Sequence, residues 1–278
     1  MIATMTEIVT QRIYNPEGST LRRAQLRMAE MLSYIDTICY NNNIIYWMDF
    51  GTLLGAARHK GFIPWDDDTD ICMPIDDYNR FKNLLISSDM FKSNQFVIEC
   101  HETDKKFFKP WISLRDTKST YLHNDVEADR ADKKLKFRGL QVDIFPVEKD
   151  ILPKFHHICH LYQKYLIDFP QRNIHHMAFL EWSVPLSYWL LHKFIKPLLR
   201  FLGRFNSNDY LVTSYGIQFT PKRYLRDVYP LQRIPFEGLM LCAPHNLDNY
   251  LTEFYGNWRK IPSANEIRTH NVNILIEE

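Results

Sequence analysis

The chain has 278 residues, 45% of them hydrophobic, so it can bury a substantial core in one large domain or two small ones. Its 34 Lys and Arg residues nearly balance 33 Asp and Glu residues, and a net charge of +1 argues against a nucleic-acid-binding protein. The first residues lack a basic region followed by an apolar one, so no secretory signal is expected.

The first predicted element is a helix over residues 19–39. A Ser-Thr pair can cap its start, and apolar residues recur along it at helical spacing, with charged residues largely on the other faces. Three consecutive asparagines end this helix and lead into a predicted strand at 44–49. We expect the helix to be scaffold for the core.

The densest chemistry follows at residues 46–73, which read YWMDFGTLLGAARHKGFIPWDDDTDICM. Gly51 ends the strand, and Thr52 can cap a helix of about two turns. The free amides at the start of such a helix can hold an anion, and Arg58 and Lys60 add positive charge nearby. This segment is therefore a candidate phosphate-binding site.

The acidic run that follows predicts a metal site. In an extended chain, alternation sends the side chains of Asp66, Asp68 and Asp70 to one side. Like charges this close raise one another's pKa, so a stable trio requires shared protons or a divalent metal. Oxygen ligands favour Mg²⁺ or Mn²⁺, with Ca²⁺ as an alternative. A metal facing an anion-binding helix start is the arrangement that phosphoryl or nucleotidyl transfer needs.

Two other interpretations of the acidic run stay open. Acidic runs are often solvated loops, although the apolar residues on both sides of this one favour a buried setting. An EF-hand would place Ile71 where the calcium loop requires glycine and Asp77 where it prefers glutamate, which argues against it.

The next elements alternate between helix and strand. Residues 75–88 suit an amphipathic helix, 96–100 a strand, and 111–122 a strand or hairpin. In that hairpin, Arg115 is either a contact for substrate phosphates or an ordinary surface base. Residues 124–136 mix charges with few apolar residues and predict a surface loop.

The segment 139–147 predicts an apolar strand with one acid, Asp143, inside it. A lone carboxylate in such a strand is costly to ionise unless it has a partner. Further on, His156 and His160 would face together on a helix as zinc ligands do. No second pair follows at finger spacing, so a plain helix is the default.

Residues 183–205 are strongly apolar but carry Lys193, Lys196, Arg200 and Arg204 at intervals of three and four. A membrane-spanning helix would not carry these charges so centrally. The pattern predicts an interfacial helix on an anionic membrane, with an acceptor-side lid or a helix buried in the fold as alternatives.

Taken together, these motifs resemble those of the LicD family of the nucleotidyltransferase superfamily, whose relatives include fukutin and fukutin-related protein. The resemblance rests on GTLLGAARHKGFIPWDDDTDICM, on RGLQVDIFP at 138–146, and on FEGLMLCAPHNLDNYLTEFYGNWRKIP at 236–262. It covers most of residues 20–262, with only a loose match over about 150–210.

The resemblance implies an α/β (α+β) fold, a nucleotidyltransferase-like mixed sheet flanked by helices, with a helical insertion or subdomain. We expect a nucleotidyltransferase-like core at 1–150 and a helical, membrane-associating insertion at 151–210. A C-terminal part at 211–278 would complete the core and the acceptor side, and its many aromatic rings predict packing or a cage for a quaternary ammonium group.

The resemblance also implies the site. Asp66, Asp68 and Asp70 on one strand and Asp143 on a neighbouring strand would bind Mg²⁺ or Mn²⁺, with Asp68, Asp70 and Asp143 as the catalytic residues. A shared metal would offset the cost of ionising Asp143, which serves either as a ligand or as the base. The substrate-binding residues would be Gly51, Thr52, Arg58, Lys60 and Arg115.

The implied reaction moves phosphocholine from CDP-choline, or a similar CDP-alcohol, to a lipid-linked cell-surface glycan such as teichoic acid, lipopolysaccharide or capsule. Three rivals stay open: transfer of another phospho-alcohol or sugar phosphate, a glycosyltransferase with a DxD motif, and a Ca²⁺-ordered binding module. Five scattered cysteines, an odd number, predict reduced thiols and a cytoplasmic protein. It would lie at the inner face of the membrane if 183–205 binds lipid.

Overall fold

The computed structural model describes residues 13–87, 95–123, 125–149, 151–218, 220–263, 266–267 and 272–276. Within these ranges, seven strands form a mixed sheet: β1 (Trp47–Met48), β2 (Asp70–Pro74), β3 (Phe96–Glu99), β4 (Ile112–Asp116), β6 (Gln141–Glu148), β7 (Tyr210–Thr213) and β8 (Arg223–Tyr224). Two further pairs are β5 (Ser119–His123) with β11 (Val272–Ile276) and β9 (Gln232–Phe236) with β10 (Leu239–Ala243).

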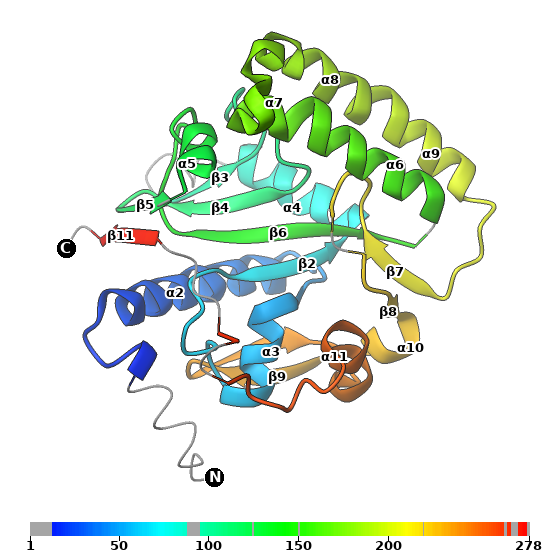
Figure 1. The fold of residues 1–278 in the computed structure, drawn as a ribbon. Helices are drawn as coiled ribbons and strands as arrows, with labels where there is room; N and C mark the ends of the chain where they lie inside the picture. The colour runs from blue at the N-terminus through cyan, green and yellow to red at the C-terminus, as the bar shows by residue number, and fades with distance from the viewer. Residues whose placement is uncertain are drawn as a thin grey trace.

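The order of the sheet is β1-β2-β6-β4-β3 (Figure 1). In addition, β7 pairs with β6, and β8 pairs with β7. β2 and β6 are parallel, whereas the other strand pairs are antiparallel. The predicted strands at 96–100 and 139–147 are confirmed to within two residues, and 111–122 forms β4 and β5. The strand predicted at 44–49 is shorter, because only β1 pairs with β2.

The helices are α2 (Thr20–Asn41), α3 (Phe50–His59), α4 (Ile75–Ser87), α5 (Val126–Asp132), α6 (Pro153–Gln163), α7 (Phe169–Arg172), α8 (Val184–Leu190), α9 (Lys196–Gly203), α10 (Leu225–Val228) and α11 (Leu247–Tyr255). A π-helical turn at Leu191–Ile195 joins α8 to α9. In Figure 1, α6, α8 and α9 lie above the sheet, and α3, α11 and β9 lie below it.

The ends of the helices follow capping rules. The predicted helix at 19–39 is confirmed as α2, and the Ser19 hydroxyl accepts a hydrogen bond from the Arg22 amide at 3.2 Å. The loop predicted at 124–136 is wrong in part, because α5 forms there. Asp125 caps it by accepting from the Ala128 amide at 2.8 Å. Two acids in its first turn add favourable charge at the positive end of the helix.

Buried apolar side chains form two clusters. The larger lies between the sheet and α2, α3, α4 and α11. The smaller joins α6, α8 and α9 to β7 through residues such as Cys159, Leu191, Leu199 and Tyr215. The segment 183–205 therefore has one face packed in the fold. No helix among the described residues is long and apolar enough to cross a membrane.

The four basic residues of 183–205 do not share one outward face. Lys196 is buried, and Arg200 forms two hydrogen bonds of 2.6 and 2.8 Å with the buried carboxylate of Glu148, whereas Lys193 and Arg204 are exposed. Many apolar side chains of this region are also exposed, and we call this set the apolar ridge. Its members are Phe179, Trp182, Leu186, Trp189, Phe194, Leu198, Phe201 and Phe205.

Candidate active site

Two of the predicted acids meet in the middle of the sheet. Asp70, the first residue of β2, lies opposite Asp143 in the parallel register with β6. The Asp143 amide donates to the Thr69 carbonyl at 2.8 Å and holds this register. Loss of hydration and the negative charges of Asp68, Asp143 and Asp66 raise the pKa of Asp70 well above its ordinary value. The negative charges of the other three predicted acids therefore reach Asp70.

The first turn of α3 contacts this acid cluster. The helix begins at Phe50, so Thr52 lies inside the first turn and is not its cap as predicted. The Thr52 hydroxyl accepts a hydrogen bond of 2.8 Å from the Asp70 amide. A side chain at Gly51 would place its Cβ 2.8 Å from Asp66 Oδ2, so glycine is needed for the carboxylate to approach this closely.

Asp143 has two partners that the sequence analysis missed. The Ser113 hydroxyl on β4 donates to Asp143 Oδ1, and the Gln141 amide donates to Oδ2 at 3.4 Å. Ser113 lies opposite Asp143 in the antiparallel register. Only the pairing of β4 with β6 brings Ser113 to Asp143, so spacing along the chain gave no signal for it.

A second buried network holds the start of α3. Asp49 is inaccessible to solvent and accepts two hydrogen bonds from the equally buried Arg223, the one from Nε being 3.0 Å long. The Tyr250 hydroxyl also donates to Asp49, at 2.8 Å, and accepts from the Trp47 indole at 3.0 Å. No motif in the sequence pointed to Arg223. The network ties α11 and β8 to Asp49, the residue that precedes α3.

The C-terminal part of the chain reaches the cluster through Tyr255 on α11. Burial and the negative charges of Asp49, Asp70 and Asp66 raise the pKa of the Tyr255 hydroxyl. Its side chain is 41% exposed, so it borders both the acids and solvent. α11 ends one residue before Gly256, which forms its C-terminal cap.

The two predicted bases on α3 have different positions. Arg58 donates to the carbonyls of Trp258 and Lys260 at 3.4 and 3.3 Å, and burial lowers its pKa although Asp66 opposes that shift. Arg58 therefore lies near the acids. Lys60 is exposed at the other end of α3, roughly 15 Å from its first turn at 1.5 Å per residue. The structure does not bring Lys60 to the candidate site.

Arg115 also differs from its predicted position as a surface contact for phosphates. It is 1% exposed, and its Nε donates to the buried Glu99 at 2.7 Å. Its Nη1 donates to the Gly139 carbonyl at 3.0 Å. Because the guanidinium is enclosed in this ion pair, we remove Arg115 from the candidate substrate-binding set.

The donor set of the cluster fits a hard divalent cation, because every candidate ligand is a carboxylate oxygen. Burial is the largest cause of the raised pKa of Asp70, and the negative charges of the neighbouring carboxylates add to it. Among the residues that the structure describes, no three His, Cys, Asp or Glu side chains are gathered closely enough to ligate an ion as they stand. The zinc alternative at His156 gains no support, since its Nε2 lies 2.9 Å from the Thr213 carbonyl.

Comparison with known proteins identifies the domain that carries this cluster. Residues 43–185, just over half of the chain, match the LicD/FKTN/FKRP nucleotidyltransferase domain. The chain is 27% identical over 272 residues to the lipopolysaccharide cholinephosphotransferase LicD of Haemophilus influenzae, an alignment that covers 91% of this chain and 96% of that protein.

Two further relatives match shorter parts of the chain. An uncharacterised protein of Rickettsia prowazekii is 30% identical over 131 residues, which are 42% of this chain and 49% of that protein. Human ribitol 5-phosphate transferase FKRP is 35% identical over 101 residues, which are 36% of this chain and 19% of that protein.

Proposed function

Because the chain belongs to the LicD family, we propose that it is a metal-dependent transferase that moves phosphocholine from CDP-choline to a cell-surface glycan. The main structural support is the register that aligns Asp70 with Asp143 on adjacent parallel strands, directly beside the first turn of α3. The full-length similarity to a lipopolysaccharide cholinephosphotransferase supports the choice of phosphocholine and of a glycan acceptor.

We assign the metal to the acid cluster. Asp66, Asp68, Asp70 and Asp143 would hold Mg²⁺ or Mn²⁺, which when bound would neutralise negative charge on the diphosphate of the donor. A cation would also relieve the repulsion that raises the pKa of Asp70. This gives a direct reason for placing so many carboxylates together in a stable fold.

The remaining steps are assigned to the chain's own groups. The amides of Gly51 and Thr52 in the first turn of α3 would donate to donor phosphate oxygens, and Arg58 would add a charge-assisted hydrogen bond. Asp143, oriented by Ser113, would serve as a ligand or accept the proton of the attacking glycan hydroxyl. Displacement at the β-phosphorus would then release CMP and leave phosphocholine on the glycan.

A CMP-release assay tests this assignment. We expect CDP-choline with a glycan acceptor to release CMP, EDTA to stop the release, and Mg²⁺ or Mn²⁺ to restore it. Asp68→Asn and Asp70→Asn should each lower turnover by roughly 10² or more, since each removes charge from the centre of the site. Asp76→Asn, at an exposed acid on α4, is the matched control and should retain full activity.

Binding of the ion can be followed without turnover. Mn²⁺ should raise the melting temperature of the wild-type protein but not that of Asp70→Asn. Full CMP release by both aspartate variants, or equal stabilisation of wild type and Asp70→Asn by Mn²⁺, would remove the metal site from the proposal.

A second donor is favoured by the similarity to ribitol 5-phosphate transferase. The same assay should therefore include CDP-ribitol and CDP-glycerol. Faster CMP release from either would change the transferred alcohol and keep the site. Release of a nucleoside diphosphate from a nucleotide sugar would instead indicate a glycosyltransferase, and Ca²⁺ binding without any turnover would indicate a binding module.

We also propose that the protein works at a membrane surface, on a lipid-linked acceptor. The support is the apolar ridge, whose side chains are each at least 47% exposed and include two tryptophans. Exposed apolar side chains gathered along one helical segment are typical of an interaction site, and Trp and Phe are typical of interfacial helices.

A further inference from the structure

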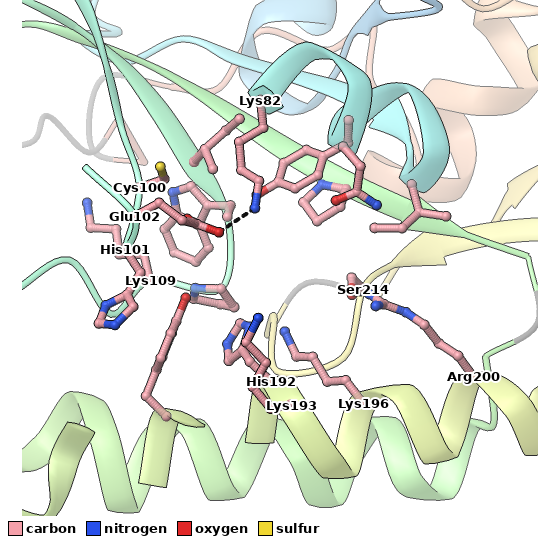
Figure 2. A pocket seen from close by; sticks show the side chains of 18 of the residues that line it. Lys82, Cys100, His101, Glu102, Lys109, His192, Lys193, Lys196, Arg200 and Ser214 are labelled. Atoms are coloured by element: carbon pink, nitrogen blue, oxygen red, sulfur yellow. Dashed lines mark hydrogen bonds and ion pairs between the residues drawn. The ribbon is translucent and has the colours of Figure 1, made fainter. Parts of the chain in front are cut away.

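A cavity of about 330 Å³ lies between α4, the segment that joins β3 to β4, and the helix formed by α8 and α9 (Figure 2). None of the residues that line it belongs to the acid cluster. β6 reaches it at Pro146, three residues beyond Asp143, which is roughly 10 Å along a strand. Because three is odd, the two side chains point to opposite faces of the sheet. The cavity is therefore distinct from the acid cluster, although Trp111 on its wall packs on Phe145 with 5.0 Å between ring centroids.

The lining of the cavity is strongly basic. Six Lys and Arg side chains and two histidines line it, against one acid, Glu102. Glu102 is already paired with Lys82 at 2.6 Å, and Arg200 is paired with Glu148 outside the cavity. The net positive charge of the remaining lining calls for an anionic ligand.

Lys196 is the most informative of these bases. Its side chain points from α9 into the cavity, beside His192 and Lys193 (Figure 2). It is 3% exposed, and among the described residues none forms an ion pair or hydrogen bond with its ammonium group. Burial and the charge of Arg200 lower its pKa to about 7. An unpaired buried ammonium is costly, so its presence here is explained by a ligand that supplies the missing negative charge.

The cavity also offers unused neutral donors and aromatic surface. The indole nitrogen of Trp111 and Nε2 of His192 are buried without a hydrogen-bond partner in the described part of the chain. The His192 ring stacks on Tyr188 with 4.0 Å between centroids, and Tyr188 and Trp111 both line the cavity. A sugar ring is apolar on its faces and polar at its edge. Aromatic side chains with polar donors nearby therefore suit it as a ligand.

We propose that this cavity binds a phosphorylated sugar, with the phosphate against Lys196 and Lys193 and the sugar ring against Trp111 and Tyr188. In the context of the proposed function, on which this identification rests, the ligand is a phosphorylated sugar unit of the glycan acceptor. The chemistry of the lining favours this over a metal-bound donor diphosphate, since the cavity carries one acid, already paired, and no metal-binding cluster.

Calorimetric titration of the full-length protein in EDTA tests the inference. The probes are glucose 6-phosphate, glucose and inorganic phosphate. Wild type should bind glucose 6-phosphate more tightly than either of the other two. Lys196→Met should weaken that binding at least tenfold, whereas Lys154→Met, which removes an exposed lysine of α6, should not change it. Trp111→Leu should weaken glucose 6-phosphate binding but leave phosphate binding unchanged.

Lys196→Met is expected to fold, because it replaces an unpaired buried charge by an apolar side chain of similar length. Equal binding by this variant and wild type would overturn the inference. Equal affinities for glucose 6-phosphate and inorganic phosphate would overturn the sugar part of it. Since the titration contains no donor or metal, its result is independent of the CMP-release assay, and either proposal can fail while the other stands.

Discussion

Two carboxylates near the site, Asp49 and Asp70, have opposite electrostatic surroundings. Asp49 is fully buried but is neutralised by Arg223 and by the hydroxyl of Tyr250. Asp70 is instead surrounded by the carboxylates of Asp68, Asp143 and Asp66, and burial together with their negative charges raises its pKa. A buried pair neutralises its charge within the fold, whereas carboxylates held close together require shared protons or a cation. We therefore interpret Asp49 as a structural residue of the site and Asp70 as a functional one.

Lys196 gives the stability of the protein a defined pH dependence. Its pKa is about 7 in the folded chain, below its ordinary value of 10.5. Between these values the unfolded chain binds a proton that the folded chain does not, so stability should rise with pH across that window. Denaturant unfolding from about pH 7 to about pH 10 should show this rise in wild type and a smaller one in Lys196→Met.

Other charged and titratable groups around Lys196 also contribute to the pH dependence of stability. They are Lys82 on α4, His101, Glu102, Lys105 and Lys109 on the β3–β4 segment, His192, Lys193 and Arg200 on its own helix, Glu148 on β6, and Cys159 on α6. Because all of them are present in both proteins, the difference between the two pH profiles isolates Lys196. Identical profiles would contradict the assignment.

Sequence reasoning reached the acids because their spacing is a local property of the chain. The alternation of Asp66, Asp68 and Asp70, and one acid in an apolar strand, are visible without a structure. Ser113 and Arg223 could not be found in this way, because their roles depend on pairing with residues distant in sequence. Arg115 was misjudged for the same reason, since its partner Glu99 lies on another strand.

At the scale of elements, α3 is the part that shapes the site. Its first turn supports β2 through Thr52, and its start carries unusual backbone geometry, with Phe50 at a φ of 44°. A bulky residue seldom adopts this left-handed conformation, and it is held here by edge-to-face packing on Phe145 and Phe254. The predicted Thr52 cap missed this, because the turn is fixed by tertiary contacts.

Thr52→Val should therefore weaken both the fold and the site. The substitution leaves the amide of Asp70 without its acceptor, which costs about 1–3 kcal/mol for a buried donor. Chemical denaturation should show this loss, and CMP release should fall because Asp70 is no longer held in place. Thr52→Ser keeps the hydroxyl and should recover most of both. A Thr52→Val protein as stable and active as wild type would show that the hydrogen bond is dispensable.

For the whole molecule, the apolar ridge and the split of the basic residues beside it predict how it meets a lipid surface. Binding should depend mainly on the ridge and less on anionic lipid, because Lys196 and Arg200 are turned inward and only Lys193 and Arg204 are exposed. In vesicle flotation, wild type should float with phosphatidylcholine vesicles with or without anionic lipid. A combined Trp182→Ser, Trp189→Ser and Phe194→Ser variant should remain in solution.

The control for this experiment is Val126→Ser, which removes an exposed apolar side chain of α5 outside the ridge. It should float like wild type. Deletion of 183–205 is not a usable variant, because Leu191 and Leu199 belong to the second buried cluster. Equal flotation of the triple variant and wild type, or failure of wild type to float, would contradict the proposal that the ridge meets lipid.

The parallel pairing of β2 with β6 has a consequence for how the protein is made. Along the chain, α4, β3, β4, β5 and α5 all separate Asp70 from Asp143, and parallel neighbours cannot be joined by a short turn. A nascent chain on the ribosome thus exposes its acidic segment well before the partner strand has been translated. Such long-range pairing forms slowly. The candidate site would then be complete only late in synthesis of the chain. Chains that end before β6 would be inactive.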